Sequence, residues 1–228
     1  MSALRLSGGP CLVEIDIAGE RLVLLPEKAL FWPARGWLLV ADVHLGKAAS
    51  FRAMGVPVPG GTTRETLDRL DAAIRRVEPA RIVFLGDFLH SRAGRAPATL
   101  ELAAQWRAGH GAIEMVLVRG NHDRHAGDPP ASLAIDTVAE PFQAAPFLLC
   151  HHPEPREEGY VLAGHLHPAV RLFGRGRDSV RLPCFHFGER VGCLPAFGAF
   201  TGSALITPVR GERCFVVADD CVVETPVR

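Results

Sequence analysis

The sequence contains no pair of cysteines at the CxxC spacing, although it has six cysteines among its 228 residues. Most of the six stand among apolar residues, which is typical of small buried side chains in a reducing compartment. This pattern argues against a disulfide framework and against a zinc knuckle.

The sequence also has no excess of charge of one sign, because 25 Lys and Arg residues balance 25 Asp and Glu residues. Domains that bind nucleic acid over a large surface usually carry a basic excess. The composition therefore counts against an extended basic surface, and it leaves open a local patch of cations.

Long uninterrupted apolar runs are missing as well. The longest uncharged run, residues 191–209, is broken by Pro195, Pro208 and three glycines, which favours strands and a turn over a membrane span. Residues 1–33 carry charges throughout and have no apolar core of the signal-peptide type. We therefore expect a single domain over residues 1–228 in the cytoplasm, with no membrane partner.

The chain does have one stretch, residues 81–90, around which the other motifs are organised. Residues 82–85 are all apolar, which predicts a strand that is covered on both faces, as in a parallel sheet. Gly86 permits a sharp turn. Asp87 then stands at the carboxyl end of the strand, where open α/β sheets bind their ligands.

Four further segments repeat this layout of an apolar run followed by side chains that bind metals. They are residues 40–44, 118–123, 149–153 and 163–168. The carboxyl ends of parallel strands meet at one edge of a sheet, so five such segments predict one metal centre. In residues 40–44, Asp42 and His44 are two positions apart, which on a strand would point both side chains to the same side.

The remaining pattern predicts an α/β fold of two packed sheets flanked by helices. Leu67, Leu70 and Ile74 recur at helical spacing within residues 63–77, after a Thr62–Glu65 capping-box pattern. A second helix is expected over residues 98–108. After Pro168 the chain changes to short strands and turns, and no internal repeat is present.

Seven side chains form a mixed set of oxygen and nitrogen ligands: Asp42, His44, Asp87, Asn121, His151, His165 and His167. Such a set suits Mn, Fe or Zn better than Ca or Cu(I). Seven ligands exceed the need of one ion, so we expect two divalent transition-metal ions about 3.5–4 Å apart and bridged by Asp87. Of the possible metals, we expect Mn before Fe or Zn. We choose His151 over His152 because it comes first after the strand.

Two such ions would clamp a phosphate and acidify a bound water, whose hydroxide attacks phosphorus. His122 is expected to serve the leaving oxygen as the catalytic acid, with Asp123 orienting its ring. The expected phosphate-binding side chains are Lys47, Arg52, His90, Arg92 and Arg124, with Arg95 and Arg119 on the same rim. The alternative is that these arginines pair with local carboxylates such as Asp123 and Asp128.

The order of these motifs over residues 37–168 resembles the calcineurin-like metallophosphoesterases. The resemblance implies a four-layer α/β/β/α sandwich with a dinuclear site. It assigns Asp42, His44 and His167 to one ion and Asn121, His151 and His165 to the other, with Asp87 bridging and His122 catalytic. The family often has an aspartate at the position of His90, so the usual carboxylate support is missing there.

Residues 39–52, 86–92 and 195–202 resemble more closely the bacterial ligase-associated DNA-damage-response metallophosphoesterases. That resemblance implies an endonuclease or phosphodiesterase that acts on DNA, with a functional link to a DNA ligase and a helicase. One alternative is a phosphatase or phosphodiesterase for a small nucleotide or a phosphoprotein. Another is a non-catalytic interaction module, against which His122 and the seven ligand positions argue.

Overall fold

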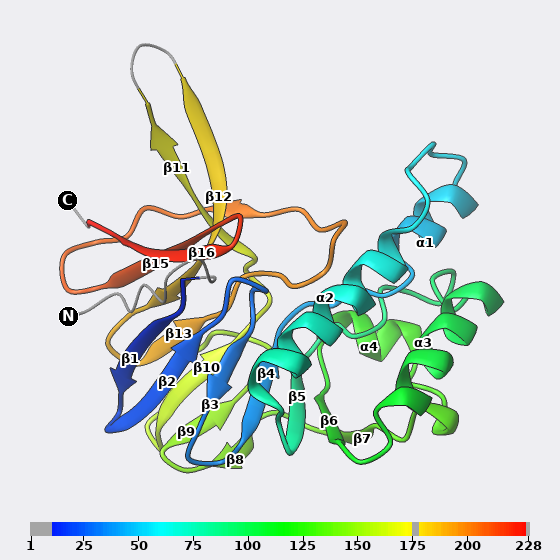
Figure 1. Cartoon of the computed structure of the whole chain (residues 1–228), viewed down its shortest axis with the longest axis horizontal. Helices are drawn as coiled ribbons and strands as arrows, with labels where there is room; N and C mark the ends of the chain where they lie inside the picture. Colours follow the sequence, from blue (N-terminus) through cyan, green and yellow to red (C-terminus); the bar gives the residue numbers. More distant parts are fainter. Residues whose placement is uncertain (1–10, 175–177, 227–228) are drawn as a thin grey trace.

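Two β-sheets pack face to face in the computed structural model, which describes residues 11–174 and 178–226 (Figure 1). The first sheet has seven strands in the order of the chain. They are β1 (Val13–Ile17), β2 (Glu20–Leu24), β3 (Leu30–Trp32), β4 (Trp37–Val40), β5 (Arg81–Leu85), β6 (Glu114–Val118) and β7 (Asp136–Val138). The α/β class and the two packed sheets expected from the sequence are confirmed.

The second sheet has nine strands, with the order β14-β11-β12-β13-β10-β9-β8 and with β15 and β16 added beside β12. The strands are β8 (Phe142–Ala144), β9 (Phe147–Leu149), β10 (Tyr160–Ala163), β11 (Pro168–Phe173), β12 (Ser179–Phe187), β13 (Val191–Cys193), β14 (Ala204–Leu205), β15 (Arg213–Ala218) and β16 (Cys221–Thr225). The β-rich second half of the chain therefore forms this sheet.

The strands that precede the ligand motifs are parallel within each sheet. β4, β5, β6 and β7 pair in parallel in the first sheet, and β9, β10 and β13 pair in parallel in the second. The connections include α1 (Lys47–Ala53), α2 (Thr62–Val77) and α3 (Pro97–Gly109). Parallel pairing brings the carboxyl ends of these strands, and hence the five motifs, to the same edge.

Two apolar clusters hold the layers together. One lies between the sheets and contains Trp32, Phe147, Phe185 and Phe215, with the rings of Trp32 and Phe147 in edge contact at 4.9 Å. The other joins the outer face of the seven-stranded sheet to the helices and includes Leu70 of α2. Burial of this apolar surface is the main force that fixes the strand ends relative to one another.

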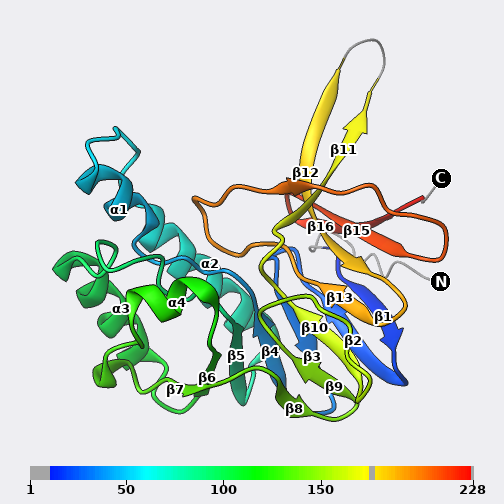
Figure 2. The same ribbon diagram turned by 180° about the vertical axis from the view of Figure 1, so that it is seen from behind.

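The helices in the described ranges all lie within residues 47–133, including α4 (Asn121–Ala126) and the 3-10 helix Ala131–Leu133. Figure 2 shows from behind that they gather on the side of β4 to β7. The other sheet carries an apolar cluster of Leu148, Cys150, Val161 and Ala163 from β9, β10 and the residue after β9, and burial raises the pKa of the Cys150 thiol. In the described ranges, every helix therefore lies in the half of the chain that forms the seven-stranded sheet.

The start of α2 differs from the sequence prediction. The cap residue is Gly61 at φ 87°, and Thr62 is the first residue inside the helix, so the Thr62–Glu65 capping box was wrong. Glu65 still lies in the first turn, where a negative charge is favourable. Among the described helices, none is long and apolar enough to span a membrane.

Candidate metal centre

The ligand side chains stand on tight turns just beyond the strand ends, rather than on the strands themselves. Asp42, His44, Asp87, His165 and His167 all have positive φ, between 49° and 70°. Non-glycine residues rarely adopt this conformation, which costs roughly 1–3 kcal/mol each and is concentrated at functional sites. The prediction that Asp42 and His44 share a face because a strand alternates was therefore wrong, because β4 ends at Val40. Both side chains reach the site through their turns.

Asp42, His44 and His167 form one compact group of ligand atoms. His167 Nε2 lies 3.3 Å from Asp42 Oδ1 and 3.3 Å from His44 Nε2. Asp87 Oδ2 is 3.8 Å from His44 Nε2. These are the three ligands that the resemblance assigns to one ion, with Asp87 beside them.

Asn121, His151 and His165 form a second group on the other side of Asp87. His151 Nε2 lies 2.8 Å from Asn121 Oδ1, 3.0 Å from His165 Nδ1 and 3.5 Å from Asp87 Oδ1. The two oxygens of Asp87 therefore face different groups, which is the arrangement that a bridging carboxylate needs.

His151 lies at the centre of this group, and His152 also offers a ligand atom near His151 and His165. The Nδ1–H of His151 donates to the carbonyl oxygen of Leu85 at 3.1 Å, which leaves Nε2 free for a metal. His152 Nδ1 lies 2.6 Å from Glu140 Oε1, and Glu140 Oε2 accepts the backbone N–H groups of both histidines. Burial alone would raise the pKa of Glu140, but the hydrogen bonds from His152 and His151 lower it. Glu140 is a supporting residue that the sequence pattern did not reveal.

The arrangement of donor atoms fits bound cations. Asp42 Oδ1 is buried and accepts no hydrogen bond from any of the described residues. His151 and His167 each direct Nδ1 at a backbone carbonyl, of Leu85 and Gly202, so their Nε2 lone pairs face the site. Ring nitrogens that approach one another to 3.0–3.3 Å with their lone pairs would repel without a positive charge between them.

Electrostatics at the centre points the same way. Burial, followed by the charge of Asp42, raises the pKa of Asp87 to about 6. Burial lowers the pKa of His44, His151 and His165, so these rings are neutral ligands near neutral pH. Burial would lower the pKa of His167, but its hydrogen bond to Asp42 and the charge of Asp42 raise it overall. Two buried carboxylates beside the neutral rings of His44, His151 and His165 favour bound cations.

Glycines allow the motif segments to approach this closely. A Cβ at Gly86, which has φ 79°, would overlap the ring of His151. A Cβ at Gly164 would lie 2.6 Å from Asp42 Oδ2 and 2.8 Å from Ala41 Cβ. These two positions exclude any side chain because the ligands occupy the space.

His122 stands beside the two groups on α4. Its Nδ1–H donates to the carbonyl oxygen of His90 at 2.7 Å, so Nε2 faces the site, 4.0 Å from Asp87 Oδ2. The carboxylate of Asp123 instead accepts the backbone N–H groups of Asp87, Leu89 and Gly120. The orienting partner of the His122 ring is thus a carbonyl, and Asp123 fixes the backbone of the Asp87 turn.

His90 supports two neighbours at once. Its Nδ1 lies 3.3 Å from Nδ1 of His44, and its ring stacks on that of His122 at 4.7 Å between centroids. Because His44 directs Nε2 into the site, its Nδ1–H donates to His90. Burial, the charge of His122 and that of Lys47 lower the pKa of His90 to about 4, so the ring is a neutral acceptor.

We predict that His90→Ala lowers turnover by about 10–100-fold, the usual effect of losing the outer partner of a metal-ligating histidine. The loss should be smaller than that of His122→Ala, because alanine keeps the His90 carbonyl that anchors His122. Metal titration and turnover on one preparation would check this. Loss of a whole ion from the variant would contradict it, by making His90 a direct ligand.

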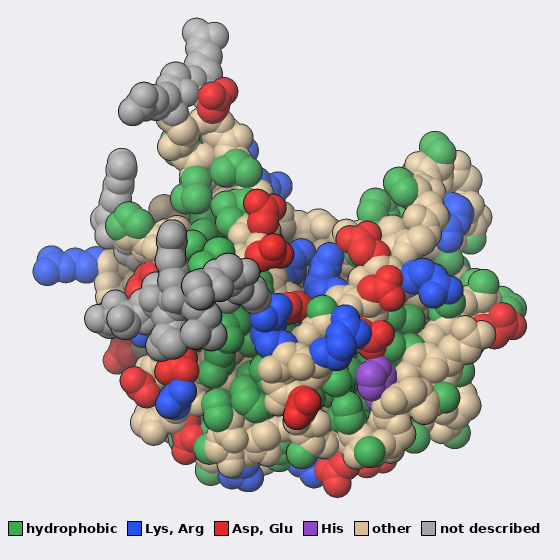
Figure 3. Space-filling view, in the orientation of Figure 1, with side chains coloured by type: hydrophobic (Ala, Val, Ile, Leu, Met, Phe, Trp, Pro, Cys, Tyr) green, Lys and Arg blue, Asp and Glu red, His purple; other side chains and the backbone are tan. Residues whose placement is uncertain are grey.

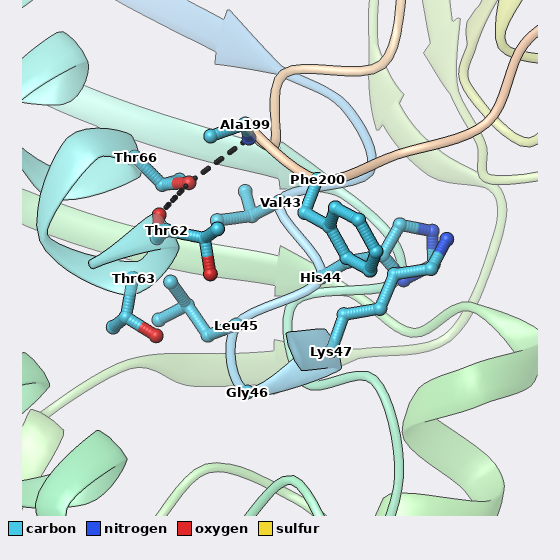
Figure 4. A pocket seen from close by; sticks show the side chains of 10 residues that line it. All are labelled: Val43, His44, Leu45, Gly46, Lys47, Thr62, Thr63, Thr66, Ala199 and Phe200. Carbon is cyan, nitrogen blue, oxygen red and sulfur yellow. Dashed lines mark hydrogen bonds between the residues drawn. The ribbon is translucent and has the colours of Figure 1, made fainter. Parts of the chain in front are cut away.

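Lys47 is the cation closest to the ligand groups. It begins α1 and lines a small pocket with His44, Thr66 and Phe200, in which its side chain extends alongside the His44 ring (Figure 4). Burial lowers the pKa of Lys47, and the charges of Asp42 and Asp87 oppose that shift. Its position suits contact with an anion held at the metal centre.

Most of the other rim cations have local partners, as the alternative interpretation anticipated. Arg119 forms two hydrogen bonds with the Asp128 carboxylate, at 2.8 and 2.9 Å. Arg52, Arg92 and Arg95 donate to backbone carbonyls of residues 59, 125 and 126–128. Arg124 is exposed on α4. Of the cations expected to ring the site, Lys47 and Arg124 are the two without such a partner among the described residues, although each guanidinium keeps further donors.

A loop that includes residues 195–202, one of the segments behind the closer resemblance, completes the site. Residues 194–203 pass over the N-terminal half of α2, where Thr66 accepts the N–H of Ala199 (Figure 4). Arg69 of the same helix donates to the Phe197 carbonyl. The same loop supplies the Gly202 carbonyl that holds His167. The loop that holds the ligand His167 is thus itself held by α2, more than a hundred positions earlier in the chain.

Residues 38–188 match the calcineurin-like phosphoesterase family, and the chain belongs to that family. The family defines a metal-dependent phosphoesterase, in keeping with the clustered Asp and His ligands. One solved structure is a much closer relative: a nuclease, MPE, from Pseudomonas putida, with 48% identity and a TM-score of 0.83. The match covers 94% of this chain and all of that one.

Two further solved structures are more distant. A phosphoesterase from E. coli, Yfce, shares 12% identity with a TM-score of 0.38, covering 84% of this chain and 99% of that one. A protein of unknown function from Aquifex aeolicus, AQ665, shares 17% identity with a TM-score of 0.37, covering 61% and 80%. No curated protein matches the chain.

Proposed function

We propose that this protein is a nuclease that hydrolyses phosphodiester bonds in DNA and acts in DNA repair. Its active site would hold two divalent transition-metal ions, with Mn expected before Fe or Zn. The observation that carries the proposal is the 48% identity to a nuclease over nearly the whole chain. The two ligand groups on either side of Asp87 support the dinuclear part. The functional link to a DNA ligase and a helicase belongs to the same proposal and rests on the resemblance alone.

The residues of the chain would divide the work as follows. The metal ions, when bound, supply Lewis-acid stabilisation of the phosphate and an activated water. Lys47 contacts a non-bridging oxygen from the α1 side. His122 delivers a proton from Nε2 to the leaving oxygen, since Nδ1 is fixed on the His90 carbonyl. His90 and Asp123 hold the His44 ring and the Asp87 turn in place.

A second candidate is a phosphatase for a small nucleotide or a phosphoprotein. The observation that favours it is the engagement of Arg52, Arg92, Arg95 and Arg119 by local acceptors, which leaves few cations for the flanking phosphates of a polymer. The site itself fits both classes, because a monoester and a diester both present non-bridging oxygens to two ions.

We predict that Mn-loaded protein opens circular single-stranded DNA and hydrolyses a chromogenic diester faster than its monoester analogue. A circle has no ends, so opening requires internal cleavage. DNA cleavage should fall steeply with salt, because contacts to phosphates release counterions. Efficient hydrolysis of the monoester with an intact circle would overturn the nuclease proposal and support the phosphatase.

A further inference from the structure

The hairpin of β11 and β12 projects from the body of the protein (Figures 1 and 2). β11 begins at Pro168, the residue after the ligand His167. Five residue pairs, from Ala169–Pro183 to Phe173–Ser179, join the two strands in antiparallel register. At about 3.3 Å per residue, Phe173 lies roughly 20 Å from His167. Successive phosphates of a strand are ~3.4 Å or more apart, so the hairpin spans a few nucleotides.

The two faces of this hairpin differ in character. Val170, Leu172 and Leu182 on one face pack into an apolar cluster with Val216 of β15. The other face carries Arg171, Arg181, Phe173 and Ser179, because side chains alternate along each strand. This second face, the Arg171/Phe173/Arg181 face, is exposed, and the Phe173 side chain stands out with 79% of its surface accessible.

The Arg171/Phe173/Arg181 face adjoins the loop that completes the metal centre. Arg181 reaches across β11 and donates to the Ser203 carbonyl, next to Gly202, which holds His167. Figure 3 shows a recess in the molecular surface between the hairpin and α1, with both basic and acidic side chains beside it. Because His167 and Arg181 bond to neighbouring residues of this loop, the face begins beside the metal centre.

The charges on this face are arranged for an anionic partner. Arg171 and Arg181 are directly opposite each other in the register, and like charges at such positions destabilise a strand pair. Arg171 makes no hydrogen bond or ion pair with any residue in the described ranges, and Arg181 keeps further donors beyond its bond to Ser203. A phosphate backbone would relieve this repulsion.

We propose, on the basis of the nuclease function proposed above, that the Arg171/Phe173/Arg181 face binds single-stranded DNA on one side of the cleaved bond. The arginines contact the backbone, and Phe173 stacks on an unpaired base. Cations that follow the backbone together with exposed aromatic rings are the combination by which proteins bind single strands. A second copy of this chain fits the face less well, because its own arginines would add to the repulsion between Arg171 and Arg181.

The test compares hairpin variants of the Mn-loaded full chain. Phe173→Ala should raise the KM for a long oligodeoxynucleotide by about 10-fold, the order of effect of one base stack, with kcat little changed. Phe173→Trp should retain the wild-type KM, because indole also stacks. The double variant Arg171→Ala, Arg181→Ala should reduce the slope of log binding constant against log salt by about 1.4, at ~0.7 per phosphate.

Two controls separate this role from structural damage. Val180→Ala removes a half-exposed side chain from the opposite face of the same hairpin and should leave the KM unchanged. Turnover of a small chromogenic diester, too short to reach the hairpin, should equal that of the wild type in Phe173→Ala, Phe173→Trp and Val180→Ala, none of which touches the loop that holds His167.

Different outcomes overturn different parts of the proposal. If the wild type opens circular DNA but Phe173→Ala and the double variant keep its KM and salt slope, the hairpin proposal fails and the nuclease proposal stands. If the wild type neither binds nor cuts the oligonucleotide, both fail. If Phe173→Ala turns a dimer into a monomer in light scattering while DNA binding is kept, the face is a contact between copies of this chain.

Discussion

Asp87→Asn should abolish tight binding of both metal ions. Mutating a residue that only supports a metal ligand lowers metal affinity by up to about 100-fold, so loss of the bridging ligand should lower it further. The two oxygens of Asp87 face the two ligand groups, at 3.8 Å from His44 Nε2 and 3.5 Å from His151 Nε2. Without this negative charge, two cations would repel each other across a buried site. Metal content by mass spectrometry, with turnover of a diester measured in parallel, checks the result.

The shape of the site should survive this change, because Asn is isosteric with Asp. The backbone N–H of His122 donates to Asp87 Oδ1 at 2.9 Å, and an amide oxygen can accept the same bond. The metal-free variant should therefore unfold at a temperature no lower than the metal-free wild type. Asp128→Asn, which changes an exposed carboxylate paired with Arg119, is the matched control and should keep both ions. Two ions at normal affinity in Asp87→Asn would mean that Asp87 is not the bridge.

The sequence predicted the strand ends of the site well, since each end is encoded locally. The apolar runs before Asp87 and Asn121 form β5 and β6, and parallel pairing brings their ends together. The parallel strands β9 and β10 do the same for His151 and His165. Apolar patterning and the position of glycines are enough for such features, because they depend on a few neighbouring residues.

The sequence could not predict the contacts that tune these residues, because they join distant parts of the chain. The Gly202 carbonyl holds His167 from 35 residues away, and Thr66 holds Ala199 from 133 residues away. The pairing of Arg119 with Asp128 depends on how one loop folds back. The positive φ of Asp42 and His44 is likewise imposed by surrounding structure against local preference. The motifs therefore predicted the metal-binding side chains, whereas the contacts that hold these side chains in place could be found only in the folded structure.

His122→Ala should keep the fold and both metal ions but lower turnover of DNA by about 10²–10⁴-fold, the usual contribution of a positioned proton donor. The backbone of residue 122 still donates to Asp87, and alanine suits the short helix α4. The variant lacks only the imidazole ring of His122. In the wild type, Nδ1 of this ring is fixed on the His90 carbonyl, and the side chain is 37% exposed. His125→Ala, one turn away on the exposed side of α4, is the matched control and should be fully active.

The dependence on leaving group separates proton donation by His122 from other roles. A chromogenic phenolate leaves readily without a proton, whereas the alkoxide of a sugar needs one, so general-acid catalysis matters more for DNA. His122→Ala should therefore lower turnover of DNA much more than turnover of the chromogenic diester. Equal losses on both substrates would assign His122 to stabilising the phosphate rather than to the leaving oxygen. Loss of an ion from the variant would instead place Nε2, 4.0 Å from Asp87 Oδ2, among the metal ligands.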